Sequence, residues 1–225
     1  MADIYATNDG IVLKNIPATS GGSWDAARDA TTGQVFDASS ASTTTGYGRI
    51  RIFTYSGVER WIIQRVYMEF DTSGITTLPT DATLKIYGTG QNNSDLIVVK
   101  GTQSDSLVAD DYDNLDFGTV YSAELATWST SGYNNFTLNS TALAAIRDNN
   151  DFKIAIINYD YDYLDVDAGS NARHETGGYF SEADSQYRPY IDVTEEAPDP
   201  VAFNEFKIKN SNLNIKKSNL KFNPK

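Results

Sequence analysis

The chain has 225 residues, with 30 acidic and 18 basic side chains and a formal net charge of −12. This acidic balance argues against non-specific binding to nucleic acid or to an anionic membrane, because polyanions attract Lys and Arg. The sequence has no cysteine, which excludes disulfides and thiolate nucleophiles. No apolar run approaches the roughly 20 residues that a membrane-spanning helix requires.

The charges are divided unevenly along the chain. Residues 1–206 hold all 30 acidic side chains and 12 basic ones, a net charge of −18, whereas residues 207–225 hold six lysines and no acid. Two prolines in residues 197–202 indicate a linker, because proline interrupts both helices and strand ladders. The sequence therefore predicts an acidic domain over residues 1–196, followed by that linker and a basic tail over residues 203–225.

The elements expected in chain order are mostly short strands. Two apolar stretches within residues 3–16 are separated by an Asn-Asp-Gly triplet at 8–10, which predicts a tight turn. Residues 17–46, rich in Gly, Ser, Thr and Ala, predict a long surface excursion anchored by Trp24 and Phe36. After it, polar and apolar residues alternate with the period of strands. The expected strands are 47–54, 61–70, 82–87, 96–100, 118–124, 135–138, 153–158, 177–180 and 190–194.

One segment departs from this alternation. Residues 139–147 place Ser and Thr before apolar residues at 142, 143 and 146, which predicts a single short helix between two strands. About ten short strands with turn signals between them are typical of sandwiches. The predicted fold class is all-β, an antiparallel jelly-roll β-sandwich with one short helix and a C-terminal β-rich extension.

The basic tail contains a seven-residue repeat. Its apolar residues come in pairs two positions apart, which fits three tiny strands joined by four-residue turns better than a helix. Burying six such side chains contributes at most roughly 9–18 kcal/mol, less than ordering nearly twenty residues costs at about 1–2 kcal/mol each. Unless the repeat is accidental, the tail is expected to order by docking on another surface. The expected docking residues are Phe206, Ile208, Leu213, Ile215, Leu220 and Phe222.

Three segments carry a family resemblance. Residues 65–73 read Arg-x-Tyr-x-x-Phe-Asp-x-Ser, residues 82–87 read Ala-x-Leu-x-Ile-Tyr, and residues 188–194 read Arg-Pro-Tyr-Ile-Asp-Val-Thr. This pattern resembles the DNRLRE-type jelly rolls, which are related to carbohydrate-binding modules. The helix and the first residues are similar to versions in tailed-phage structural proteins. In such a motif, an inward Arg65 paired with a carboxylate is more often a determinant of the fold than a catalyst.

Aromatic side chains could bind sugars, because sugar faces stack on exposed Trp or Tyr while polar groups take the hydroxyls. The alternation of Tyr and Asp in residues 159–163 would put three tyrosines on one face of a strand. A half-buried strand continuing from residues 154–158 would show the same pattern. The candidate carbohydrate-binding residues are Tyr159, Tyr161, Tyr163, Trp128 and Tyr133.

The acidic clusters are candidates for calcium, which takes six to eight oxygen ligands. The densest cluster offers Asp160, Asp162, Asp165 and Asp167 as candidate ligands, although its spacing is not that of an EF-hand. A second cluster at residues 110–116 departs from that spacing as well. The alternative for both is a solvated acidic loop, so the expectation is no cofactor, with calcium as the exception.

The sequence offers little for catalysis, and no catalytic residue is predicted. His174 is the only histidine, and no G-x-S-x-G motif provides a nucleophile beside it. A paired-carboxylate glycosidase stays open, but no pair among the acids stands out. The protein is therefore expected not to be an enzyme.

The leading functional hypothesis is a structural component on the surface of a bacteriophage virion, such as a head decoration, head fibre or tail accessory protein. Its partners would be other virion proteins or sister subunits, bound through the tail of a homo-oligomer. The first residues lack the features of a secretory signal, so a chain made from this start is not expected to use the general secretory route. The alternative is an extracellular carbohydrate-binding module or adhesin that binds cell-surface polysaccharide.

Overall fold

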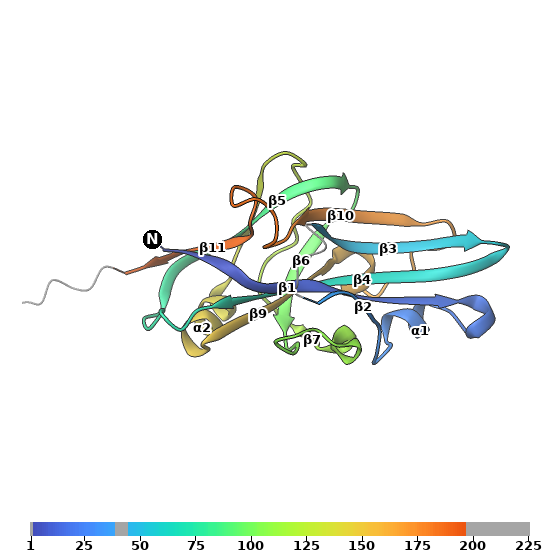
Figure 1. Ribbon diagram of the computed structural model, residues 1–225, viewed down its shortest axis with the longest axis horizontal. Helices are drawn as coiled ribbons and strands as arrows, with labels where there is room; N and C mark the ends of the chain where they lie inside the picture. The colour runs from blue at the N-terminus through green and yellow to red at the C-terminus, as the bar shows by residue number, and fades with distance from the viewer. Residues whose placement is uncertain (1, 39–44, 197–225) are drawn as a thin grey trace, which may run out of the picture.

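The computed structural model describes residues 2–38 and 45–196, so the expected linker, the tail and its docking residues lie outside the described residues. The described chain is all-β, with eleven antiparallel strands and few helices (Figure 1). The strands are β1 (Ala2–Pro17), β2 (Gln34–Ala38), β3 (Thr45–Tyr55), β4 (Val58–Asp71), β5 (Pro79–Asn92), β6 (Leu96–Gly101), β7 (Leu115–Val120), β8 (Tyr133–Thr137), β9 (Asp151–Asn158), β10 (Arg173–Tyr179) and β11 (Tyr190–Glu195).

The predicted helix is present as α2, and Asn139 caps it by accepting a hydrogen bond from the backbone N–H of Ala142 at 3.1 Å. A second, five-residue helix, α1, lies in the expected surface excursion. No helix in the described part of the chain is long and apolar enough to cross a membrane. The helical segments are α1 (Trp24–Arg28), α2 (Ser140–Asp148), the 3-10 turns η1 (Ala18–Ser20) and η2 (Ala109–Asp113), and the π-helical turn η3 (Tyr159–Tyr163).

The strands form two layers because β1 and β5 pass from one sheet into the other. Residues 2–5 of β1 pair with β11, whereas residues 6–17 pair with β4. Likewise, residues 79–85 of β5 pair with β11 and residues 88–92 pair with β10. The small sheet comprises the start of β1, β11, the first part of β5, and β8. The remaining strands and strand segments form the large sheet.

Two hydrophobic clusters stabilise these layers. The first lies between the sheets, where Leu84 and Phe136 of the small sheet meet Ile154 of the large sheet, and α2 adds Ile146. The second covers the opposite face of the large sheet with side chains from α1 and η2, among them Trp24. The central strands β4, β6 and β9 of the large sheet are thus buried on both faces. Within the described residues, neither cluster covers the outer face of the small sheet.

The tight turn predicted at residues 8–10 was wrong, because β1 runs through the triplet as a continuous strand with a register shift between Ala6 and Asn8. The Asp9 side chain is buried there, and its Oδ2 accepts a hydrogen bond from the backbone N–H of Ser181 at 2.7 Å. A tertiary contact therefore replaces the local turn. The strand expected at 118–124 likewise begins and ends earlier, at 115–120.

Candidate functional site

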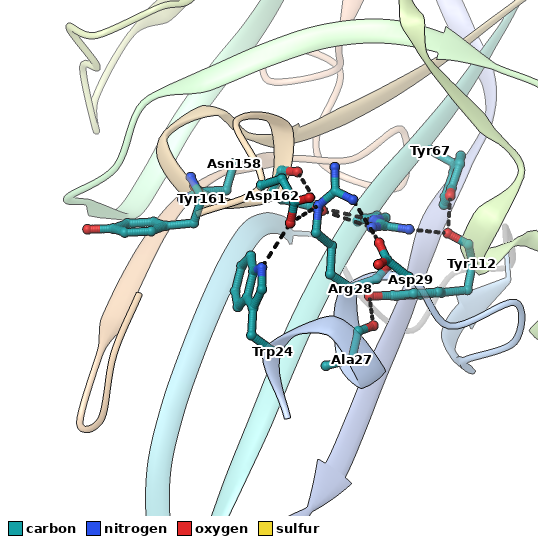
Figure 2. Close-up of polar contacts among 11 residues, drawn as sticks. Trp24, Ala27, Arg28, Asp29, Tyr67, Tyr112, Asn158, Tyr161 and Asp162 are labelled. Carbon is teal, nitrogen blue, oxygen red and sulfur yellow. Dashed lines mark hydrogen bonds and ion pairs between the residues drawn. The ribbon is translucent and has the colours of Figure 1, made fainter. Parts of the chain in front are cut away.

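The most concentrated polar network is buried, and it joins Arg65 of β4 to Asp162 of η3. Figure 2 shows Asp162 with the neighbouring side chains of Trp24 and Arg28. Nε and Nη2 of Arg65 donate to the two carboxylate oxygens of Asp162 at 2.9 and 2.8 Å, and both side chains are fully buried. Nη1 donates to the Tyr112 carbonyl at 2.8 Å, and Nη2 also donates to the Arg28 carbonyl at 2.9 Å. The guanidinium lies 4.2 Å from the centre of the Tyr112 ring.

This network is satisfied from within the protein. The Tyr67 hydroxyl donates to the Tyr112 carbonyl at 3.0 Å, and the Tyr112 hydroxyl donates to the Ala27 carbonyl at 2.8 Å. Burial raises the pKa of both tyrosines, so both hydroxyls remain protonated donors at neutral pH. Since each named group has a protein partner, the arrangement ties β4, α1, η2 and η3 together. Arg65 therefore has the structural role that its motif implied.

The candidate binding surface lies on the outer face of the small sheet. Side chains alternate between the two faces of a strand. In the small sheet, the residues next to those that face the core therefore point to the outer face. The register places Tyr5 of β1 opposite Tyr190 of β11, and Tyr87 of β5 opposite Tyr133 of β8. The end of β10 and the following loop add two more rings. We call this set the tyrosine face: Tyr5, Tyr87, Tyr133, Tyr179, Tyr187 and Tyr190.

The six rings of the tyrosine face form an unbroken series of contacts. From Tyr5 the series passes to Tyr190 at 5.5 Å between ring centres, to Tyr133 at 5.3 Å and to Tyr87 at 5.3 Å. Tyr187 and Tyr179 lie 4.6 and 5.8 Å from Tyr87, between ring centres, and stack on each other at 4.9 Å. These are the centroid separations of favourable aromatic pairs, so the rings hold one another in place.

Hydrogen bonds fix two members of this face. The Tyr87 hydroxyl donates to the Ser131 carbonyl at 2.7 Å. The Tyr133 hydroxyl lies 3.0 and 3.1 Å from the carbonyls of Gln186 and Arg188, which ties β8 to the loop that carries Tyr187. Tyr5 is 46% exposed, and the other five rings are half-buried. The face therefore presents ring surface to solvent without freely rotating side chains.

Polar groups lie beside these rings. Lys85 is 5.3 Å from the centre of the Tyr190 ring, and its Nζ pairs with Asp192 at 3.0 Å. Asp3 and Asn135 lie on the same side of the sheet, since each is two residues from a tyrosine of the face. An aromatic platform with an ammonium, carboxylates and an amide at its margin can stack a ring and bind its hydroxyl groups.

The structure separates the five predicted carbohydrate-binding residues. Tyr133 belongs to the tyrosine face, but Trp128 is buried and donates from Nε1 to the Gly177 carbonyl at 3.0 Å, so its ring packs in the core. Residues 159–163 form a π-helical turn instead of continuing the strand. The rings at 159 and 163 stack at 5.6 Å, whereas Tyr161 packs on His174 at 4.4 Å. The three tyrosines therefore do not share one strand face.

The four predicted calcium ligands do not converge. Asp162 is committed to Arg65, and Asp165 accepts a hydrogen bond from Nε1 of Trp24 at 3.1 Å. In the described ranges, no group of three carboxylate or imidazole side chains is arranged to hold a metal ion. Asp160 instead accepts a long hydrogen bond from the Asp95 backbone N–H at 3.3 Å.

A further carboxyl pair was not singled out by the sequence. Burial raises the pKa of Asp9 to about 7, and the neighbouring Glu182 carboxylate contributes to that shift. Both effects favour the protonated form of the Asp9 carboxyl. No sequence signal could have found this pair, because 172 residues separate Asp9 from Ser181, the residue before Glu182.

Comparison with known protein families and with curated protein sequences identifies no relative of this chain. The likeness to DNRLRE-type jelly rolls therefore stays a resemblance of motifs.

Proposed function

We propose that the protein is a non-enzymatic glycan-binding module whose tyrosine face binds a neutral polysaccharide. The observation that carries this proposal is the unbroken series of six tyrosine rings on the side of the small sheet that neither hydrophobic cluster covers. A row of fixed rings offers successive stacking surfaces, which suits a repeating ligand better than a compact one.

Charge narrows the class of glycan. Residues 1–206 carry a net charge of −18, with 30 acidic and 12 basic side chains, and Asp3 and Asp192 lie at the margin of the face. The ammonium of Lys85, which lies beside the Tyr190 ring, is already paired with Asp192. Uronic acids and sulfated sugars would be repelled, so neutral chains are the better ligands.

The test is affinity electrophoresis of the full chain through gels that contain neutral glucans, mannans, galactans or xylans. At least one polysaccharide is expected to retard the protein, and Tyr190→Ala is expected to weaken that binding about tenfold or more, a loss of roughly 1.4 kcal/mol. Tyr5→Ala gives a second variant at a more exposed ring. The matched control is Tyr55→Ala, because Tyr55 is 63% exposed at the end of β3 and away from the face. Equal mobility in every gel would exclude the proposal.

A role on a virion surface is a second proposal, favoured by the charge split between the acidic domain and the six lysines of residues 207–225. A basic segment suits docking to an acidic protein surface, and a glycan-binding domain could then hold the particle on a glycan-coated surface. Mass spectrometry of purified particles tests it, and absence of the chain from them would contradict it. In that role the protein would be found on virions, whereas a free glycan-binding module would be extracellular.

A further inference from the structure

A groove of about 160 Å³ lies along the edge of β8, next to the tyrosine face. On the other side it is bounded by the segment that precedes β8. The lining residues are Ala123, Glu124, Leu125, Asn135, Phe136 and Thr137. A cavity of about 150 Å³ accepts a six-membered ring such as benzene, so this groove has room for one ring of that size.

The groove lies between two chain segments, residues 121–129 and residues 134–139. Hydrogen bonds join these segments at both ends, and the segments diverge between them. At one end the Asn139 N–H donates to the Tyr121 carbonyl at 2.9 Å, beside the bridge between Ser122 and Leu138. At the other end Ser129 N–H donates to Oδ1 of Asn134 at 2.7 Å, and Nδ2 of Asn134 donates back to the Ser129 carbonyl at 2.9 Å. The opening is thus held by contacts on both sides.

The β8 edge presents backbone groups to this groove. Leu138 N–H donates to the Ala82 carbonyl of β5 at 3.0 Å, so Leu138 and every second residue before it point their backbone groups toward β5. Asn135 therefore points its N–H and C=O away from β5, into the groove. Within the described part of the chain, no hydrogen bond to the backbone or side chain of Asn135 is found.

The opposite wall carries the carboxylate of Glu124. The pKa of the Tyr159 hydroxyl is raised, chiefly by its interaction with the Glu124 side chain. Asp95 lies close by, and burial, together with the charges of Asp160 and Glu124, raises its pKa. This surrounding negative charge disfavours anionic ligands. Tyr159, a predicted sugar-binding residue, thus lies beside Glu124 and is not among the lining residues of the groove.

We infer that the groove binds one neutral pyranose ring, as a subsite next to the tyrosine face. The Glu124 carboxylate and the Asn135 backbone supply hydrogen bonds to ring hydroxyls, while Leu125 supplies apolar contact. Asn135 lies two residues from Tyr133 on the same side of β8, about 7 Å along the strand. A glycan on the tyrosine face can therefore extend one ring into the groove, and the choice of a sugar as ligand rests on the proposed function.

The test uses single sugars, which are too short to require the tyrosine face. The full chain, labelled with ¹⁵N, is titrated with the methyl glycosides of glucose, galactose, mannose and N-acetylglucosamine at millimolar concentration. The amide resonances of Glu124 and Asn135 are expected to shift with at least one of them. Ala123→Trp fills the groove and is expected to weaken this binding about tenfold or more. Ala126→Trp is the matched control, because Ala126 is exposed on the same segment but does not line the groove.

The two proposals fail in different ways. Tyr190→Ala is expected to weaken polysaccharide binding while leaving the monosaccharide shifts at Glu124 and Asn135 unchanged. If none of the four glycosides shifts these amides, or if Ala123→Trp leaves the shifts as they are, the groove is not a sugar site. The polysaccharide gels would then still test, independently, whether the tyrosine face binds a neutral polysaccharide.

Discussion

Arg65 and Asp162, 97 residues apart in the sequence, meet as a two-pronged ion pair with neither side chain exposed to solvent. Burial by itself lowers the pKa of Arg65, but the charge and hydrogen bonds of Asp162, together with smaller contributions from Tyr112 and Tyr67, make the net shift upward. The Arg65 guanidinium therefore stays charged, and its burial is favourable only while its carboxylate partner is present.

Removing one partner of this pair is expected to be costly. Asp162→Ala leaves the Arg65 guanidinium buried without its counter-charge, which lowers the free energy of unfolding by about 3–5 kcal/mol. Urea unfolding followed by tryptophan fluorescence measures this loss. Asp184→Ala, at an exposed position, is the control and is expected to change stability by less than about 0.5 kcal/mol. The double variant Arg65→Met/Asp162→Leu is expected to recover part of the loss; a double variant as unstable as the sum of the singles would contradict this account.

Asp9 is expected to make stability depend on pH. Its pKa is about 7 in the folded protein and near 3.9 when unfolded, so between these values the folded state binds the extra proton. Asp9 therefore contributes full stability below about pH 4, and this contribution is lost as pH rises through 7, by at most about 4 kcal/mol. Asp9→Asn keeps the acceptor for Ser181 N–H and cannot ionise.

The measurement is urea unfolding of both proteins at several pH values from acid to mildly alkaline. The stability of Asp9→Asn relative to the original chain is expected to rise with pH and to level off above about pH 7. Since the other carboxyl groups are common to both proteins, the difference isolates Asp9. A difference that does not change with pH would show that the pKa of Asp9 is the same in the folded and unfolded states, which would contradict the expectation.

Gly88, where β5 leaves the small sheet, is expected to tolerate no side chain. A Cβ there would lie 1.9 Å from the Ser129 carbonyl oxygen and 2.6 Å from Nε1 of Trp128. Gly88→Ala is therefore expected to lower the free energy of unfolding by about 1–3 kcal/mol. Gly74→Ala is the matched control, because no atom lies within 4 Å of its Cβ position. Thermal unfolding by circular dichroism compares the two, and equal melting temperatures would contradict the expectation.

Binding at the tyrosine face is expected to be nearly independent of salt. Stacking of neutral sugars on Tyr5 and Tyr190 involves no net charge, so raising ionic strength screens no attraction that matters. Affinity for the best neutral polysaccharide is expected to change by less than about twofold across the physiological range of ionic strength. A steep loss of affinity with salt would instead indicate an ionic ligand.

Deletion of residues 203–225 is expected to leave the melting temperature of the acidic domain unchanged. Within the described residues, both hydrophobic clusters and all eleven strands lie before residue 197. The same deletion is expected to abolish anchoring or assembly if the tail is a docking segment. Unchanged incorporation into virions would remove the assembly role.

The sequence was sufficient to predict most strands and the fold class, because alternation of apolar and polar residues indicates a strand with one buried face. It failed at Asp9, where a contact 172 residues away overrides an Asn-Asp-Gly turn signal. It also failed at 159–163, where Asp162 turns inward to meet Arg65 and winds the segment into η3. Both errors come from partners that a local window does not contain.

The tyrosine face as a whole could not be predicted from the sequence either. Tyr87, Tyr133 and Tyr190 each occupy the polar side of an alternating strand, so their exposure could be read from the sequence. That they lie side by side depends on β5 pairing with both β8 and β11, which no spacing along the chain specifies. Sequence reasoning therefore found one member, Tyr133, and missed the surface.

The pairing of β1 with β11 sets how the domain would respond to a pulling force. Ala2 lies opposite Val193 and Tyr5 opposite Tyr190, so the two ends of the described chain leave from the same end of an antiparallel pair (Figure 1). Tension applied through both ends would open these residue pairs one after another, as a zipper opens, instead of loading them together in shear. Held by its C-terminal side alone, the domain avoids that geometry and bears load through β11, which β5 and β1 flank on both sides.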